Sequence, residues 1–272
     1  MDLFDLSGRV YVVTGSTGAL AGSAADYLAA QNARVVYLGR RQERIDAALT
    51  KSREKTADAQ CFGLTADILD RPALERARDS VLRQWGRIDG LVNGAGGNIP
   101  GATIPPDKAF SDLNFESFQQ VVDLNLHGTV LPSLVFAPAM VEGGRGSIVN
   151  FSSVSAPQAV TRVVGYSAAK AGVENFTRWL AVDMARRTGG KVRVNAVLPG
   201  FFLGEQNRRL LTNEDGSFTE RGKLVIGKTP FARFGEAGEL HGAIHYLLAD
   251  ASKFVTGTIL PVDGGFIAFS GV

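Results

Sequence analysis

Short apolar runs bounded by glycine alternate with longer amphipathic segments along most of the chain. Apolar runs of about four to eight residues are typical of buried strands, whereas apolar positions that recur at helical spacing indicate amphipathic helices. A regular alternation of the two predicts βαβ units, in which helices cover both faces of a parallel sheet. No internal repeat or low-complexity linker divides the chain. The pattern therefore predicts an α/β fold that forms a single domain over residues 1–272.

The expected architecture is a doubly wound parallel sheet of the Rossmann type with about seven strands and helices on both faces. Its strands are predicted at residues 9–14, 33–38, 61–65, 88–93, 147–152, 192–198 and 258–262. The longer helices are predicted at residues 18–31, 42–55, 72–85, 115–135 and 166–187.

Two irregular segments interrupt this alternation. Residues 97–113 contain Pro100, Pro105 and Pro106, which are too many helix breakers for a helix. Residues 201–230 form a long excursion after the sixth predicted strand. Both follow the carboxyl ends of strands, where open α/β sheets place their ligands. We expect a substrate loop at 97–113 and a lid at 201–230; mere surface insertions are the alternative.

The composition narrows the classes of partner. The 272 residues are 45% hydrophobic and 21% charged, with a formal net charge of +2. Such a small charge gives no electrostatic reason to bind nucleic acid or an anionic membrane. The start of the chain lacks the pattern of a secretory signal, and no stretch approaches about 18 apolar residues. We therefore expect a cytoplasmic protein with a small-molecule substrate and neither a nucleic-acid nor a membrane partner.

The cysteine and histidine content argues against a metal site. The one cysteine, Cys61, excludes an internal disulfide and is expected in the core near a strand. His241 and His245 are four residues apart and fit one amphipathic helix better than a pair of ligands. No metal is expected.

The strongest chemical signal is the pairing of Tyr166 with Lys170. Residues four apart lie on the same helix face, so the phenol and the ammonium are expected to be neighbours. A free phenol has a pKa of about 10, and a nearby ammonium lowers it toward the range useful for proton transfer. Ser152 and Ser153 precede the tyrosine at the end of a predicted strand, and either could hydrogen-bond a substrate oxygen. The spacing of 13 residues to Tyr166 favours Ser153.

A second signal follows the first predicted strand. Gly15, Gly18 and Gly22 allow a tight turn and a close approach of a pyrophosphate to a helix N-terminus. Arg40 and Arg41 end the second strand, where a carboxylate would bind a free ribose hydroxyl and an arginine would bind a 2′-phosphate. This favours NADP(H) over NAD(H). The alternative is that Arg40 stacks on adenine and accepts either cofactor.

Taken together, the motifs resemble those of the short-chain dehydrogenase/reductase family, over essentially the whole chain. They are residues 14–18 (TGSTG), Asp67, 93–96 (NGAG), Asn125, Ser153, Tyr166 with Lys170, 199–200 (PG) and 262–265 (VDGG). Four positions depart from the family pattern. Ala19 and Ala21 replace the second and third glycines of TGxxxGxG, Gly94 replaces an asparagine, and Gly204 stands where many members carry threonine.

The resemblance implies roles for these residues. Tyr166 would be the general acid/base, Lys170 would lower its pKa and bind the nicotinamide ribose, and Ser153 would orient the carbonyl. Asn125 would hold a water through its backbone, which completes a catalytic tetrad. Asp67 would contact the adenine. The expected cofactor-binding residues are Gly15, Thr17, Gly18, Leu20, Arg40, Arg41, Asp67, Ile68, Asn93, Ala95, Gly96, Tyr166, Lys170, Pro199, Gly200 and Phe202.

Within the family, the narrower resemblance is to the D-mannonate oxidoreductase (fructuronate reductase) branch. It rests on residues 93–98, 199–203, 205–208, 213–216 and 263–266. A sugar acid needs a cation for its carboxylate and polar partners for its hydroxyls. We expect Arg208 to bind the carboxylate, with Arg162 as the next candidate, and the remaining substrate contacts to come from Asn98, Ser153, Gln158, Tyr166, Gln206 and Asn207. The alternatives are a gluconate 5-dehydrogenase or related polyol or keto-acid reductase, and a non-catalytic dinucleotide sensor.

The resemblance also implies a homotetramer. Its interface is expected on the helices around 114–136 and 166–187, which carry Val122, Leu126, Ala171 and Val182. Core packing explains these residues nearly as well.

Overall fold

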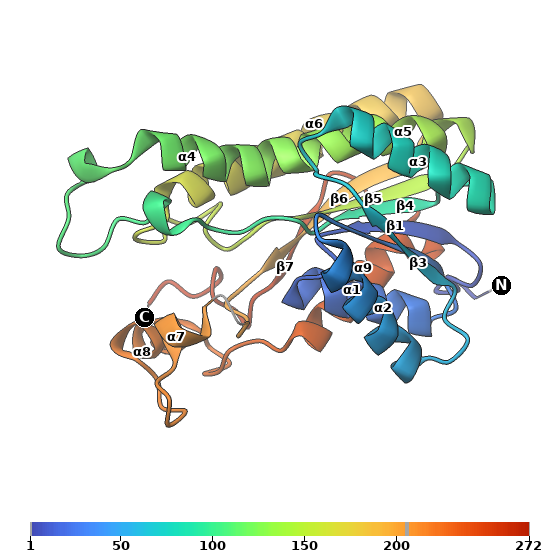
Figure 1. Cartoon of the computed structure of the whole chain (residues 1–272). Helices are drawn as coiled ribbons and strands as arrows, with labels where there is room; N and C mark the ends of the chain where they lie inside the picture. Colours follow the sequence, from blue (N-terminus) through green and yellow to red (C-terminus); the bar gives the residue numbers. More distant parts are fainter. Residues whose placement is uncertain (1, 205–206, 272) are drawn as a thin grey trace.

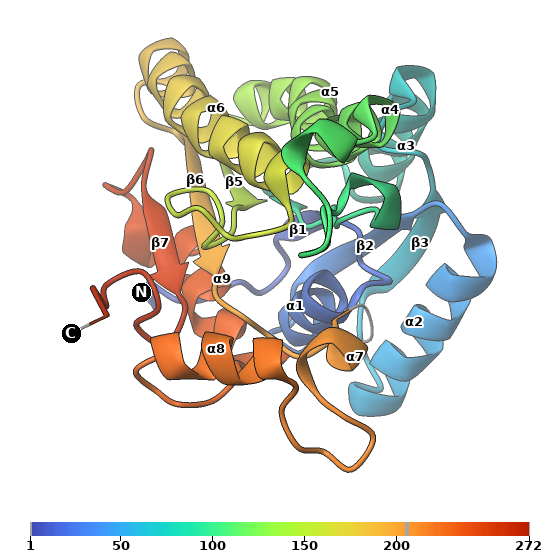
Figure 2. The same ribbon diagram turned by 90° about the vertical axis from the view of Figure 1, so that its left-hand side faces the viewer.

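Seven parallel strands form one twisted sheet in the order β3-β2-β1-β4-β5-β6-β7 (Figures 1 and 2). The computed structural model describes residues 2–204 and 207–271. This is the doubly wound α/β sheet that the sequence predicts. The strands are β1 (Val10–Thr14), β2 (Arg34–Gly39), β3 (Cys61–Thr65), β4 (Gly90–Asn93), β5 (Gly146–Phe151), β6 (Val192–Pro199) and β7 (Ile259–Val262).

Two layers of helices cover the sheet (Figure 1). One layer contains α1 (Ala19–Ala30), α2 (Gln42–Lys55) and α9 (His241–Leu248), and the other contains α3 (Arg71–Trp85), α4 (Phe115–Val122), α5 (Gly128–Glu142) and α6 (Val164–Thr188). Alternate residues of β1 serve the two layers, since Tyr11 and Val13 belong to the core beneath α1, and Val10 and Val12 to the core beneath α3 and α5. A strand buried on both faces reads as a continuous apolar run, which is why the strands were recognisable.

The long helix predicted at 115–135 has an interruption. A π-helix, η3 (Asp123–His127), joins α4 to α5. The whole helical stretch, Phe115–Glu142, is long and apolar enough to cross a membrane, which the reading of the sequence did not anticipate. However, 56% of its most apolar window is buried inside the fold, as in the core helix of a soluble domain.

The two irregular segments contain only short elements. Residues 97–113 form two single 3₁₀ turns, η1 (Pro100–Ala102) and η2 (Phe110–Asp112), as their prolines predict. The excursion after β6 contains α7 (Arg208–Leu211) and α8 (Glu220–Lys228), and the 3₁₀ turns η4 (Ala237–Leu240) and η5 (Asp250–Ser252) flank α9.

The cysteine and the histidine pair lie in packed structure. Cys61 is buried at the start of β3. His241 and His245 lie on α9 and bond to Ser23 and Tyr27 of α1, respectively. Within residues 2–204 and 207–271, no group of three or more His, Cys, Asp or Glu residues is arranged to hold a metal ion.

Candidate active site

The principal predicted site residues gather at the carboxyl edge of the sheet, where β1, β4, β5 and β6 end beside one another. Figure 2 looks onto this edge, which is surrounded by the segment before α4, the loop before α6, and the helices α7 and α8. The chain changes direction across the sheet between β1 and β4. Doubly wound sheets bind their ligands at such a switch point.

A glycine turn connects β1 to α1. Gly15 has φ +67°, and a Cβ built on it would lie 2.6 Å from the Cα of Ala95, so no side chain fits there. Gly18 is the N-cap of α1, and no side chain caps this helix. Free N–H groups at an uncapped helix start form a cradle for an anion such as a pyrophosphate. Thr17 and Leu20 flank this cradle and are partly buried.

The departures from the family's glycine pattern are paired in space. A Cβ built on Gly94 would lie 2.5 Å from the Cβ of Ala21, so the missing side chain at 94 leaves room for the additional methyl at 21. A Cβ on Gly204 would lie 3.6 Å from the Cβ of Ala19, an ordinary contact. The segment after β6 therefore reaches the start of α1, and the altered turn keeps close packing.

The end of β2 presents two free cations. Arg40 and Arg41 are exposed, and neither side chain forms a hydrogen bond or ion pair with the residues that the structure describes. On the neighbouring β3 side, an Asp67 carboxylate oxygen accepts a hydrogen bond from the Leu69 N–H at 2.9 Å. Ile68 is buried against Gly128. Arginines without partners are available to bind a phosphate.

Asn93 fastens the central strands together rather than projecting toward a ligand. Its side-chain N–H group donates to Asn150 Oδ1 at 2.9 Å and to Ser133 Oγ at 3.0 Å. Asn150 in turn donates to Thr177 Oγ1 at 2.9 Å. The sequence reading missed Asn150 and Thr177, because buried polar residues on separate elements have no sequence spacing that marks them as partners.

Asn125 holds the loop after β4 from within the π-helix. Its side chain accepts from Gly97 N–H at 3.0 Å and donates to the Gly97 carbonyl at 2.7 Å. A Cβ on Gly96 would lie 2.6 Å from Asn125 Oδ1 and 3.4 Å from Lys170 Nζ. Gly96 therefore lets Asn125 and Lys170 approach the same stretch of backbone.

The two serines after β5 have different partners. Ser152 is buried, and its hydroxyl donates to Glu174 Oε1 at 2.8 Å, which engages it with α6. Ser153 Oγ accepts from the N–H and the hydroxyl of Ser155. It also lies close enough to Tyr166 to influence the pKa of the phenol. Of the two serines, Ser153 is therefore the one near Tyr166, and its contact with a substrate stays a prediction.

Tyr166 and Lys170 lie together on α6, and burial shifts the pKa values of both. Lys170 Nζ lies 5.6 Å from the centre of the Tyr166 ring and donates to the Phe151 carbonyl at 2.7 Å. Burial lowers the pKa of Lys170 to about 8. Burial also raises the pKa of Tyr166, although the hydrogen bond with Ser153 acts to lower it. This is opposite to the direction expected from the helical pairing alone, because lost hydration of the phenolate outweighs its favourable contacts.

The turn after β6 packs against the segment after β7. Gly200 N–H donates to the Val262 carbonyl at 3.0 Å, and a Cβ on Gly200 would lie 2.7 Å from the Cα of Asp263. The Pro199 carbonyl accepts from Val154 N–H, and Phe202 is buried beside Gly235. These contacts set the course of the excursion that follows.

The described amides that are predicted to bind substrate already have hydrogen-bond partners within the chain. Asn98 donates to Thr103 Oγ1, and Asn207 bonds to the backbone of Phe202 and Gly204. Gln158 donates to the Ile267 carbonyl and accepts from Lys228 Nζ. Arg208 is exposed at the start of α7, and Gln206 lies outside the described residues. The contacts therefore give Asn98, Gln158 and Asn207 a structural role.

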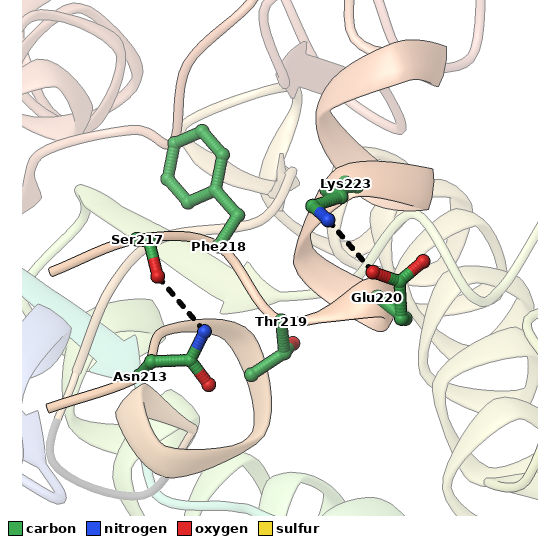
Figure 3. Close-up of a pocket in the computed structure, with 6 residues that line it drawn as sticks. All are labelled: Asn213, Ser217, Phe218, Thr219, Glu220 and Lys223. Atoms are coloured by element: carbon green, nitrogen blue, oxygen red, sulfur yellow. Dashed lines mark hydrogen bonds and ion pairs between the residues drawn. The ribbon is translucent and has the colours of Figure 1, made fainter. Parts of the chain in front are cut away.

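The hollow in Figure 3 lies between the 213–218 turn and the start of α8. Among its lining residues, Asn213 and Ser217 bond to each other, as do Glu220 and Lys223. None of its lining residues belongs to the predicted site. A smaller hollow is lined in part by Gly200 and Phe202, at the end of β6.

Comparison with known proteins identifies relatives over nearly the full length. A family model described as enoyl-(acyl carrier protein) reductase matches residues 15–267. An uncharacterised oxidoreductase of Bacillus subtilis, UxuB, is 42% identical over 277 residues, with 98% of each chain covered. The gluconate 5-dehydrogenase of Gluconobacter oxydans is 31% identical over 264 residues, which cover 97% of this chain and 96% of that enzyme.

A solved structure is similar throughout. It is the crystal structure of a provisionally named D-mannonate oxidoreductase from Haemophilus influenza with bound NAD. It has a TM-score of 0.91 and 35% sequence identity, with 98% of both chains covered.

Proposed function

The chain belongs to the short-chain dehydrogenase/reductase family and is an oxidoreductase, and on this premise we propose that it interconverts the secondary alcohol of a sugar acid and the corresponding ketone. D-mannonate and D-fructuronate are the proposed pair. One observation carries the proposal: Tyr166, Lys170, Ser153 and the Asn125-bound loop converge at the carboxyl end of β5.

The chain's own residues suit a nicotinamide dinucleotide. The uncapped start of α1 would hold the pyrophosphate, and the close backbone approach at Gly15 and Ala95 keeps side chains out of that cradle. Lys170, whose ammonium lies beside the backbone of Gly96, would bind the nicotinamide ribose. When bound, the nicotinamide supplies the hydride for reduction or accepts it in oxidation.

Tyr166 would move the proton. Its raised pKa keeps the phenol protonated at neutral pH, so it can donate to the ketone oxygen during reduction. Ser153 would hydrogen-bond the same oxygen and orient it. In the oxidation direction the phenol must instead take up the proton from the alcohol, and the ammonium of Lys170 favours the phenolate form. Asn125 would keep the Gly96–Gly97 backbone in place beside Lys170.

NADP(H) is the proposed cofactor, with NAD(H) as the alternative. Arg40 and Arg41 are exposed and unpaired within the described part of the chain, which suits a 2′-phosphate. The similar Haemophilus structure contains NAD, which supports the alternative.

The choice of sugar acid rests on the relatives. The similarity to the provisionally named D-mannonate oxidoreductase supports mannonate and fructuronate, and the similarity to gluconate 5-dehydrogenase supports gluconate as the second candidate. A non-catalytic dinucleotide sensor would not need the converging proton-transfer groups.

The test is a panel of hexonates and their ketones, assayed with both cofactors by nicotinamide absorbance. We expect the highest kcat/KM for D-fructuronate reduction with NADPH. Tyr166→Phe should lower kcat by about 10²–10⁴-fold while cofactor affinity stays near that of the wild type, because only the proton donor is lost. Faster turnover of 5-ketogluconate would favour the second candidate, and a Tyr166→Phe enzyme with more than about a tenth of the normal kcat would refute the assigned proton donor.

A further inference from the structure

Two arginines belong to the contact between the loop before α6 and the helix α8. Arg221, in the first turn of α8, donates to Thr161 through both terminal nitrogens, to the hydroxyl and to the carbonyl, each at 3.3 Å. Arg162 is the next residue of that loop. One helical face of α8 also carries Lys228, whose ammonium donates to Gln158 Oε1 at 2.7 Å. The loop before α6 is therefore lined by cations along its contact with α8.

Neither arginine is neutralised. Within residues 2–204 and 207–271, neither Arg162 nor Arg221 forms an ion pair with a carboxylate. By contrast, Lys223 on the same helix pairs with Glu220. Burial lowers the pKa of Arg221, and the nearby positive charge of Arg162 lowers it further. Two partly buried like charges without a counter-ion are unfavourable unless an anion joins them.

The backbone at Arg162 is held in an unfavourable conformation. Its φ is +78°, in the left-handed region that residues other than glycine rarely adopt. Its carbonyl accepts a hydrogen bond from Ile104 N–H at 3.0 Å, which ties the loop before α6 to the 97–113 segment. Such strain persists where neighbouring contacts fix it, and it is concentrated at functional sites. Arg162 lies four residues before Tyr166 and two before the start of α6.

We propose that Arg162 and Arg221 together bind the carboxylate of the sugar acid, and so set the preference for acidic over neutral substrates. The inference rests on the proposed function and adds the residues that recognise the negative charge of the substrate. Guanidinium groups suit this task, because their planar donors match the two oxygens of a carboxylate. Thr161 holds Arg221 in place, whereas the exposed side chain of Arg208 has no partner within the described residues. The pair therefore replaces Arg208 as the first candidate.

The experiment compares a charged ketose with its neutral counterpart. D-fructuronate and D-fructose share the ketone and differ at the terminal carbon, which is a carboxylate in one and an alcohol in the other. The ratio of their kcat/KM values is measured for the wild type, Arg162→Gln, Arg221→Gln, Arg221→Lys and Arg208→Ala. Lys223→Ala is the matched control, because it removes a cation from the same helix without removing either guanidinium. The ratio is internal to each variant, so a general loss of stability does not change it.

Each glutamine variant should lower the fructuronate-to-fructose ratio by about 10- to 100-fold, as expected for a lost charge-assisted bond. Arg221→Lys should recover only part of the ratio, because lysine keeps the charge without the planar fork. Lys223→Ala should leave it unchanged. An unchanged ratio in both glutamine variants, or a loss confined to Arg208→Ala, would overturn the assignment while the proposed function stands. Equal kcat/KM values of the wild-type enzyme for fructose and fructuronate would overturn both the assignment of the two arginines and the proposed sugar-acid function. This result would be known before any variant is made.

Discussion

At the scale of single residues, the departures from the family's glycine pattern make sense as pairs. Ala21 occupies space beside Gly94, and Ala19 lies near Gly204, yet the members of each pair are far apart in the chain. Read one at a time, each substitution puts the cofactor turn in doubt. Read as contacts, they preserve the packing between α1 and the loops after β4 and β6.

This pairing predicts a rescue. Gly94→Ala should destabilise the protein by about 1–3 kcal/mol, because the new methyl would overlap Ala21. Ala21→Gly in the same chain should restore most of the loss, as measured by urea unfolding. Gly96→Ala is the control, since its methyl would meet Asn125 and should show no rescue by Ala21→Gly. Additive effects of Gly94→Ala and Ala21→Gly would contradict the pairing.

The choice of cofactor is also decided by single residues. Arg40→Asp should shift the preference from NADP(H) toward NAD(H), because a phosphate partner is exchanged for a carboxylate that suits a free 2′-hydroxyl. The measurement is the ratio of kcat/KM for the two cofactors. Arg44→Asp, an equally exposed change on α2, serves as the control. If the ratio stays constant in Arg40→Asp, this residue does not contact the 2′ position of the cofactor's ribose.

At the scale of elements, the π-helix is the feature that connects the fold to the site. The π-helix is a widened turn between α4 and α5, and Asn125 lies within it. The side chain of Asn125 bonds to both the N–H and the carbonyl of Gly97. The π-turn shifts the register of α5 relative to α4, compared with an unbroken α-helix. The interruption therefore changes which residues face the loop. The helix thus determines where the backbone beside Lys170 lies.

Asn125→Ala should therefore affect both stability and turnover. Loss of the bonds to Gly97 should reduce the free energy of unfolding by about 1–3 kcal/mol, and kcat should fall with it. Asn114→Ala is a matched control on the same helical stretch, because it removes an N-cap bond to Ser117 at a cost of about 1 kcal/mol. Turnover should survive that change. Equal losses of kcat in the two variants would mean that Asn125 acts only through stability.

At the scale of the whole molecule, the helix layer of α4, α5 and α6 presents apolar side chains to the outside. Leu134, Trp179 and Val182 are 58%, 64% and 52% exposed. Of the interface residues expected from the sequence, Ala171 and Val182 are exposed, while Leu126 packs against Gly172. Exposed apolar residues on neighbouring helices favour an association surface.

We expect a homotetramer that uses this surface. Light scattering should give four times the monomer mass for the wild type and a smaller species for Trp179→Glu, because a buried carboxylate without a partner is costly. Leu224→Glu changes a similarly exposed residue on α8 and should leave the assembly intact. A monomeric wild type would refute the tetramer, and an intact tetramer in Trp179→Glu would place the interface elsewhere.

The sequence by itself determined the class of fold, and it predicted the chemistry at its centre. Seven strands were expected close to where they occur, because strands buried on both faces leave continuous apolar runs that glycine bounds. Tyr166 and Lys170 could be paired because both lie on one helix, where spacing alone sets which side chains are neighbours. Ser153 followed from its distance to the tyrosine.

Only the tertiary structure decided what depends on contacts between distant segments. Three contacts join separate elements: the hydrogen bond between Asn93 and Asn150, the hydrogen bonds between Asn125 and Gly97, and the packing of Ala21 on Gly94. The raised pKa of Tyr166 depends on burial, which spacing does not reveal. The same reason applies to Arg162 and Arg221, which lie 59 residues apart in sequence and become neighbours only because α8 packs on the loop before α6.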